Sequence, residues 1–262
     1  MQRRQSKKER RQTRILDALK HNPAKRVNEL ADELEVSPET IRRDLSELDA
    51  EGRIRRTYGG AVRTSPLEPA LADRMKLHVQ AREQIAACAV DALQDFENLY
   101  IGGGATTLHF ARALRQVERS LTILTASFEI AIELAANPLF KVISVPGRVE
   151  LQEGLVHGPD TLRFIADYHV QAAIIGASAI DEVGVSEAHP SAADVYAAMI
   201  QQAEHTYVVA DRSKIGHKSL KRILNWNERT TLVTDCELSR DMQQSFEAAG
   251  ANLAVADYQR RP

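Results

Sequence analysis

The sequence has few of the features that mark membrane, secreted or metal-binding proteins. Its longest apolar stretch, residues 172–180, is far shorter than the ~18 residues of a membrane span. No apolar segment follows the basic N-terminus, so a secretory signal is not expected. The two cysteines, Cys88 and Cys236, and the eight histidines show no metal-ligand spacing. These absences predict a cytoplasmic protein with no membrane partner, no metal and no cofactor.

The length and the distribution of charge indicate two parts. A chain of 262 residues is long for one small domain and suits a small module followed by a larger one. Residues 1–64 hold 16 Lys and Arg against 11 Asp and Glu, a net charge of +5, and the remaining 198 hold 18 against 25, a net charge of −7. Basic segments attract polyanions such as nucleic acids. On charge alone, a solvated basic tail is an equal alternative.

Three short helices are expected in the basic part. Residues 8–20 and 27–34 place apolar side chains on one face at helical spacing, and Pro23 ends the first of these helices. The third helix is expected over residues 37–51, with Ser37 as N-cap and Pro38 at the first helical position.

The third helix has the two faces of a DNA-recognition helix. Ile41, Leu45 and Leu48 form an apolar stripe, and Arg43 lies nearly opposite Ile41. Arginine can bind guanine or phosphate through two parallel hydrogen bonds. A helical bundle with solvated arginines is the alternative. The residues of this helix predicted to contact DNA are Ser37, Thr40, Arg42, Arg43 and Ser46.

A basic hairpin is expected after the third helix. Residues 53–58 alternate in the manner of a strand, a double glycine supplies a turn, and residues 61–63 form a possible return strand. Such a wing contributes phosphate contacts and salt dependence more than choice of sequence. Its predicted DNA-contacting residues are Arg55, Arg56, Tyr58, Gly59 and Gly60.

Residues 12–63 resemble the winged helix of the DeoR family of bacterial transcription regulators. The resemblance rests on LADELEVSPETIRRDLSELDAEGRIRRTYGGAV at residues 30–62, which contains the family's TIRRDL at 40–45. It implies sequence-specific operator binding, usually by a repressor. The domains expected are therefore a winged helix-turn-helix domain over residues 1–62, a linker with two prolines over 63–72, and an effector-sensing and oligomerisation domain over 73–262.

The larger part alternates short apolar runs with helical segments, which predicts an α/β fold with a mainly parallel sheet covered on both faces. Strands are expected at residues 98–102, 121–125, 141–146, 172–176, 206–210, 231–235 and 252–256. Helices are expected at residues 79–96, 106–116, 128–136, 160–168, 192–204 and 240–249.

Ligands of such sheets bind at the carboxyl ends of the strands, so the loops there hold the candidate effector site. Gly103, Gly104, Ala105, Thr106 and Thr107 lie between the first strand and its helix, where backbone N–H groups and the helix N-terminus attract an anion. A glycine-rich turn without a ligand is the alternative.

Two further loop residues are candidates for the same site. Lys214 could bind a phosphate or carboxylate, and Asp181 could accept hydrogen bonds from sugar hydroxyls. For Lys214 a solvent-facing position, and for Asp181 a turn-forming role, are the open alternatives.

Residues 73–257 resemble the DeoR-family sensor domain, which is similar in fold to ribose-5-phosphate isomerase and senses phosphorylated sugars. The matches are the loop 103–107, Gly158-Pro159, 175–181 with Gly184, and 211–216 with Lys214. The resemblance also shows departures: the family's aspartate is Gly102 or Gly103, its glycine is Ala105, its asparagine is Ala126, its lysine is Tyr196 and its double glycine is Pro146-Gly147. These departures leave the identity of the effector open.

Three functions can be set against each other. The leading one is a transcription regulator, most often a repressor, which binds a double-stranded DNA operator as a dimer or tetramer and responds to a phosphorylated or acidic metabolite. The second is a sugar-phosphate isomerase with an accessory DNA module, for which Asp181, Glu187 and Asp211 are the carboxylate bases available and His189 a weak helper. The third is a DNA binder without an effector. No catalytic residue is predicted.

Overall fold

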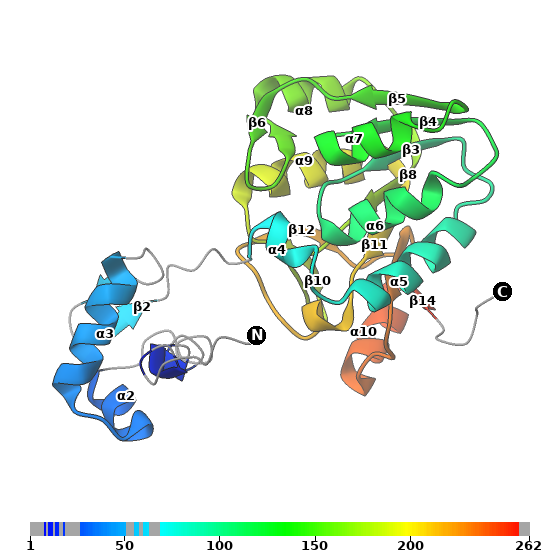
Figure 1. The fold of residues 1–262 in the computed structure, drawn as a ribbon. Helices are drawn as coiled ribbons and strands as arrows, with labels where there is room; N and C mark the ends of the chain where they lie inside the picture. Colours follow the sequence, from blue (N-terminus) through cyan, green and yellow to red (C-terminus); the bar gives the residue numbers. More distant parts are fainter. Residues whose placement is uncertain are drawn as a thin grey trace. The chain divides into compact units, whose positions relative to one another are not determined.

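The computed structural model describes residues 8, 10–12, 14, 15, 18, 27–50, 55–57, 60–62 and 69–256, with backbone only at 49, 50, 55–57 and 60–62. The chain divides into two compact units, Met1–Leu67 and Glu68–Pro262. Both are drawn in Figure 1.

The N-terminal unit contains the predicted helix-turn-helix and hairpin. The described residues between 8 and 18 are helical, and α2 (Val27–Leu34) and α3 (Pro38–Ala50) follow. Strands β1 (Arg55–Thr57) and β2 (Gly60–Val62) pair antiparallel. The core of the unit is built from the apolar faces of the three helical segments: Ile15, Ala18, Leu30, Ala31, Leu34, Ile41, Leu45 and Leu48.

The turn between α2 and α3 follows from local chemistry. Glu35 has a positive φ of 53°, and the Val36 N–H donates to the Ala31 carbonyl at 3.0 Å, so the backbone reverses within two residues. The Ser37 hydroxyl then accepts a hydrogen bond from the Thr40 N–H at 3.2 Å, which confirms Ser37 as the N-cap of α3.

The C-terminal unit is built on a seven-stranded parallel sheet. Its strands lie in the order β14-β13-β11-β8-β3-β4-β5. Their bounds are Asn98–Ile101 (β3), Leu121–Thr125 (β4), Phe140–Ser144 (β5), Val170–Ile175 (β8), Ala203–Val209 (β11), Thr230–Thr234 (β13) and Asn252–Val255 (β14). Each of the seven predicted strands is found, and the α/β fold is confirmed.

Helices cover both faces of this sheet, because alternate residues of each strand point to opposite sides. Leu99 and Ile101 share one buried cluster with α5 (Val79–Asp91), α6 (Ala105–Leu114) and α7 (Phe128–Ala135). Tyr100, between them, belongs to a second cluster with residues of α8 (Pro159–Ala166), α9 (Pro190–Gln201) and α10 (Arg240–Ala249). The six predicted helices are all present (Figure 1).

The sequence pattern does not reveal the short antiparallel elements. These are the hairpin of β6 (Arg148–Glu150) and β7 (Leu155–His157), and the small sheet of β9 (Ala179–Ile180), β10 (Gly184–Glu187) and β12 (Lys221–Asn225). Strands of two to five residues are too short to show a clear alternation of apolar and polar residues. Helix α4 (Leu71–Arg74) was not predicted either, and it begins inside the segment predicted as a linker.

Two features are absent from the residues that the structure describes. None of their helices is long and apolar enough to cross a membrane. Within the same part of the chain, no group of three or more His, Cys, Asp and Glu side chains is arranged to hold a metal ion.

Candidate functional site

Helix α3 presents the predicted polar face at the surface of the N-terminal unit. Ile41, Leu45 and Leu48 are at most 1% exposed, whereas the side chains of Arg42 and Arg43 are 52% and 84% exposed. Ser37 and Ser46 are also exposed, and Thr40 is half-buried beside the Ser37 hydroxyl at 2.8 Å. Arg42 pairs with the exposed Glu39 at 3.0 Å, and Arg43 lies 3.9 Å from the half-buried Glu47, so neither arginine is drawn into the core of the unit.

A half-buried ion pair holds α3 to the first helical segment, which contains the described residues between 8 and 18. Arg11 donates to both carboxylate oxygens of Asp44, through Nε at 2.5 Å and Nη2 at 3.0 Å, and Asp44 is 2% exposed. The hydrogen bonds and charge of Asp44 raise the pKa of Arg11. No role was predicted for Asp44, although it lies three residues after Ile41 and four before Leu48, on the apolar stripe.

The structure covers the predicted wing in part. Arg55 and Arg56 lie in β1 and Gly60 begins β2. The side chains of this hairpin, together with Tyr58 and Gly59, lie outside the described residues.

The C-terminal unit has a pocket where its strand order changes direction. From β3 the chain moves through β4 to β5, and from the adjacent β8 it moves the other way through β11, β13 and β14. Loops at such a switch point diverge and leave a crevice beyond the carboxyl ends of the strands. The pocket lies there, between Gly103 and Gly104 after β3 and Gly176 and Ala177 after β8.

The glycine loop opens α6 toward this pocket. Gly104 is the N-cap of α6 with φ 127° and ψ 169°, a conformation that L side chains rarely adopt. The N–H groups of the first turn, at Ala105, Thr106 and Thr107, have no acceptor within the helix. Ala105 and Thr106 line the pocket, so this end of α6 can receive an anion.

Tyr196 of α9 contacts the glycine loop through its hydroxyl group and its ring. Its hydroxyl donates to the Gly103 carbonyl at 3.0 Å. A Cβ added at Gly102 would lie 3.0 Å from the Tyr196 ring, so a larger residue there would fit only if the ring moved by a few tenths of an ångström. The Thr107 hydroxyl donates to the Gly104 carbonyl at 3.0 Å, and Thr107 is fully buried rather than in the pocket lining.

Three cations line the pocket: Arg74, Arg82 and Lys214. Lys214 ends the short helix η1 (Arg212–Lys214), which follows β11. Arg82 of α5 is 2% exposed; its Nε donates to Asp211 at 3.1 Å and its Nη1 donates to the Arg74 carbonyl. Burial alone would raise the pKa of Asp211, but hydrogen bonds from Ser213 and the charge of Arg82 outweigh it and lower that pKa.

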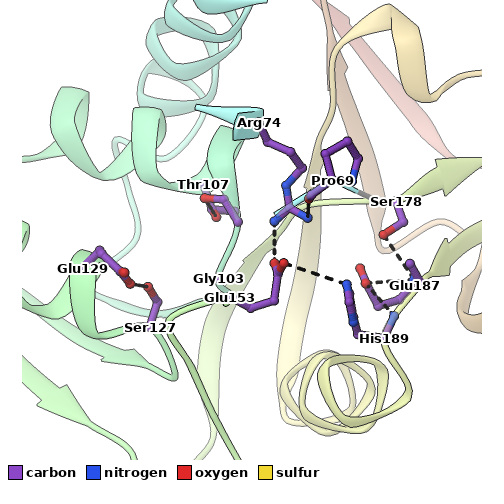
Figure 2. A network of polar contacts seen from close by, with 12 residues as sticks. Pro69, Arg74, Gly103, Thr107, Ser127, Glu129, Glu153, Ser178, Glu187 and His189 are labelled. Carbon is purple, nitrogen blue, oxygen red and sulfur yellow. Dashed lines mark hydrogen bonds and ion pairs between the residues drawn. The ribbon is translucent and has the colours of Figure 1, made fainter. Parts of the chain in front are cut away.

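Two carboxylates, Glu153 and Glu187, also line the pocket, and Figure 2 shows Glu153 pointing toward Arg74. Glu153 accepts a hydrogen bond from Arg74 Nη2 at 2.5 Å, and its other oxygen lies 3.8 Å from His189 Nε2. Glu187 accepts hydrogen bonds from the backbone N–H groups of Ala188 and His189 at 2.8 and 3.0 Å. The lining therefore combines three cationic side chains, which attract anions, with two carboxylates, which accept hydrogen bonds.

Asp181 lies outside this lining and has a structural role. Its Oδ1 accepts hydrogen bonds from the N–H groups of Val183 and Gly184 at 3.0 and 2.9 Å, which shapes the turn from β9 to β10. Arg222 of β12 binds both of its oxygens, at 3.0 and 2.9 Å. Burial acts to raise the pKa of Asp181, and these hydrogen bonds lower it overall. The turn-forming alternative is the one that the geometry favours.

The pocket brings together most of the predicted loop residues and adds others. Gly103, Gly104, Ala105, Thr106 and Lys214 line it, whereas Thr107 is buried behind the loop and Asp181 is elsewhere. The lining residues without a predicted role in effector binding are Arg74, Arg82, Glu153, Gly176, Ala177, Glu187, Ala192 and Tyr196. Arg74 lies just after the predicted linker and Glu153 in a hairpin turn, where a charged residue carries no signal of its own.

Both units match family models. Residues 11–66 match the DeoR-like helix-turn-helix domain, and residues 77–236 match the DeoR C terminal sensor domain. The chain belongs to the DeoR family. The resemblance inferred from the sequence is thereby confirmed.

Curated DeoR-family relatives match the chain over most of its length. The HTH-type transcriptional repressor GlcR of Bacillus subtilis is 29% identical and covers 93% of this chain and 94% of its own. The HTH-type transcriptional repressor CsqR of Escherichia coli is 32% identical over 80% of each chain. The glycerol-3-phosphate regulon repressor of Escherichia coli is 30% identical over 79% of this chain and 82% of its own.

Solved structures with more distant likeness include an isomerase and a translation factor. Ribose 5-phosphate isomerase A from Methanocaldococcus jannaschii has a TM-score of 0.39 and 18% identity, over 51% of this chain and 53% of its own. The eIF2B delta subunit from Chaetomium thermophilum has a TM-score of 0.45 and 14% identity, over 88% of this chain and 72% of its own.

Proposed function

We propose that this protein is a transcriptional repressor that binds operator DNA through α3 and the β1–β2 hairpin and responds to a small phosphorylated metabolite. The observation that carries the proposal is the division of α3 into a buried stripe, Ile41, Leu45 and Leu48, and an exposed face with Arg42 and Arg43. A short helix packed through one face and exposing arginine near its start has the form that reads the major groove.

DNA contact is assigned residue by residue. Arg42 and Arg43 contact base edges or phosphates from α3, and Ser37, Thr40 and Ser46 contribute hydroxyl groups. Arg55, Arg56, Tyr58, Gly59 and Gly60 form the wing that follows the DNA backbone. Operators of such proteins contain two half-sites, so we expect a homo-oligomer, dimer or tetramer, that acts on the chromosome in the cytoplasm.

The effector site is the pocket at the switch point. A phosphate bound there accepts hydrogen bonds from the free N–H groups at the start of α6 and pairs with Lys214. The curated relative named a glycerol-3-phosphate regulon repressor supports an effector of this class. Effector binding changes operator affinity only through its different affinity for the DNA-bound and free forms of the protein.

The ion pairs and hydrogen bonds of Asp181, Glu187 and Asp211, the three candidate catalytic bases, support a sensor rather than an isomerase. Asp211 is paired with Arg82, Asp181 with Arg222, and Glu187 accepts two backbone hydrogen bonds. A general base needs a carboxylate that can approach the proton that it removes. We therefore propose that the protein has no isomerase activity.

Fluorescence anisotropy tests the proposal. A duplex from upstream of the gene and a scrambled duplex are titrated with the protein at several salt concentrations, and the complex is then challenged with a panel of sugar phosphates. We expect tighter binding to the upstream duplex, released by one compound, and loss of that release in Lys214→Ala but not in Lys218→Ala. Equal affinity for both duplexes at every salt concentration would contradict operator recognition.

A further inference from the structure

Arg74 is held in the pocket by a carboxylate of the protein itself. Its Nη2 donates to Glu153 Oε2 at 2.5 Å, and its Nη1 donates to the Pro69 carbonyl at 3.2 Å. The two charged side chains are 7% and 11% exposed, so the ion pair lies largely out of solvent (Figure 2). A guanidinium in a ligand pocket is a binding group for carboxylates and phosphates. In this structure, Glu153 supplies that anion.

Glu153 is anchored less firmly than the other carboxylates of the pocket region. Asp211 has a buried partner in Arg82, and Glu187 is held by two backbone N–H groups. Glu153 lies in the four-residue turn between β6 and β7, and all three residues of β6 are exposed. Its contact with His189 is too long for a hydrogen bond. Among the described residues, its carboxylate therefore has one hydrogen-bond donor, Arg74.

The pocket is too small for a metabolite while Glu153 is in place. Its empty space is about 440 Å³ when the solvent at its mouth is included, but the centre of a water-sized sphere can reach only about 30 Å³ of it. Sites for small metabolites usually measure ~300–1,000 Å³. A lining side chain must therefore move when a ligand enters, and of the two lining carboxylates Glu153 accepts fewer hydrogen bonds than Glu187.

We infer that Glu153 occupies the place of a second anionic group of the effector, and that Arg74 binds this group once Glu153 has moved into solvent. This inference rests on the proposed effector site, in which the start of α6 and Lys214 bind the phosphate. It names the ligand class: a small phosphate ester that also carries a carboxylate or a second phosphate.

The exchange is balanced in hydrogen bonds and in charge. Arg74 loses the Glu153 carboxylate and gains the anion of the ligand, and the released carboxylate is hydrated. A hydroxyl group in the same place would leave Arg74 with a weaker, uncharged acceptor. A monophosphate without a second anion therefore cannot displace Glu153 as effectively.

Calorimetry with the full chain tests this with matched pairs of probes. The pairs are glucose 6-phosphate with 6-phosphogluconate, glycerol 3-phosphate with 3-phosphoglycerate, and fructose 6-phosphate with fructose 1,6-bisphosphate. We expect the second member of at least one pair to bind tenfold or more tightly than the first. The pair that shows the preference distinguishes a carboxylate from a second phosphate.

Two variants connect that preference to the ion pair. Glu153→Gln removes the competing charge, so the preferred ligand with two anionic groups should bind about 10- to 100-fold more tightly. The control variant Glu150→Gln, on exposed β6, should leave the affinity unchanged. Arg74→Gln alone would leave a buried charge without its partner, so the double variant Arg74→Gln with Glu153→Gln is used. It should lose the preference and keep the affinity for the monophosphate.

Different results would contradict the role of Glu153 and the proposed effector site. Two outcomes would show that Glu153 does not substitute for a ligand group, while the phosphate site would stand. In the first, every monophosphate binds as well as the compound with two anionic groups in its pair. In the second, Glu153→Gln strengthens the binding of both members of a pair equally. If no compound, inorganic phosphate included, stabilises either the wild type or Glu153→Gln against heat, the effector site itself is refuted.

Discussion

Arg82 and Asp211 form an ion pair that is buried almost completely, although 129 positions separate them in the sequence. The Arg82 Nε lies 3.1 Å from Asp211 Oδ2, and the two side chains are 3% and 0% exposed. Because Arg82 also donates to the Arg74 carbonyl, the pair joins α5, the loop after β11 and the end of α4 beneath the pocket. Asp211, one of the three carboxylates considered as a catalytic base, therefore has a structural role.

Asp211→Asn should destabilise the C-terminal unit in a pH-dependent way. Removing one member of a buried pair costs about 3–5 kcal/mol at neutral pH. Since the folded-state pKa of Asp211 is lowered, its stabilisation is present above the unfolded pKa of about 4 and is lost as the pH falls through the folded value. The difference between wild type and variant should therefore shrink in acid.

Urea unfolding followed by Trp226, the single tryptophan, measures this difference at several pH values. Asp160→Asn is the control, because Asp160 pairs with Arg163 at the surface, where such pairs contribute little. A difference that stays constant from pH 7 to pH 3 would contradict the assigned sign.

Arg43→Ala should weaken specific DNA binding without unfolding the protein. The side chain is 84% exposed and its contact with Glu47 is 3.9 Å long, so its loss costs the fold little. A base-contacting arginine contributes about 1–3 kcal/mol, or roughly 5- to 150-fold in affinity. Anisotropy with the upstream duplex measures the change, and Arg163→Ala, an exposed arginine of the other unit, serves as control. Unchanged affinity would remove Arg43 from the interface.

Gly104→Ala should abolish phosphate binding, because the new side chain disfavours φ 127° and the loop must change shape. Gly158→Ala is a matched control: Gly158 is the N-cap of α8 with φ 121° and ψ 179°, and a Cβ there meets nothing within 4 Å. Both variants should lose similar stability. Only Gly104→Ala should lose thermal stabilisation by inorganic phosphate, and equal loss in both would count against the loop as the anion site.

Tyr196→Phe should weaken effector binding through the glycine loop. The variant removes the hydroxyl that donates to the Gly103 carbonyl, at a cost of about 1 kcal/mol in stability. Tyr100→Phe is matched, since the Tyr100 hydroxyl donates to the Ile165 carbonyl at the same 3.0 Å within the core. Calorimetry with inorganic phosphate should show weaker binding for Tyr196→Phe alone. If Tyr100→Phe has the same effect, Tyr196 does not position the loop.

The strands and helices of the main sheet could be predicted because each carries a local signal. Residues 121–125 and 230–234 are short runs of threonine and aliphatic residues bounded by polar turns, which is typical of buried strands. The hairpin β6–β7 could not be predicted: β6 is exposed at all three positions, so no alternation marks it. Yet this hairpin carries Glu153 into the pocket.

Local patterns of residues are enough to set the two faces of α3 and the position of the glycine loop before α6. Both depend on neighbouring residues: helical periodicity separates Arg43 from Ile41, and glycine permits the backbone of Gly104. The roles of the charged residues depend instead on the fold. Asp181 binds Arg222, Asp211 binds Arg82 and Arg74 binds Glu153 because the fold brings together segments 41, 129 and 79 positions apart. Ion pairs depend on distance in space, which no local pattern of residues records.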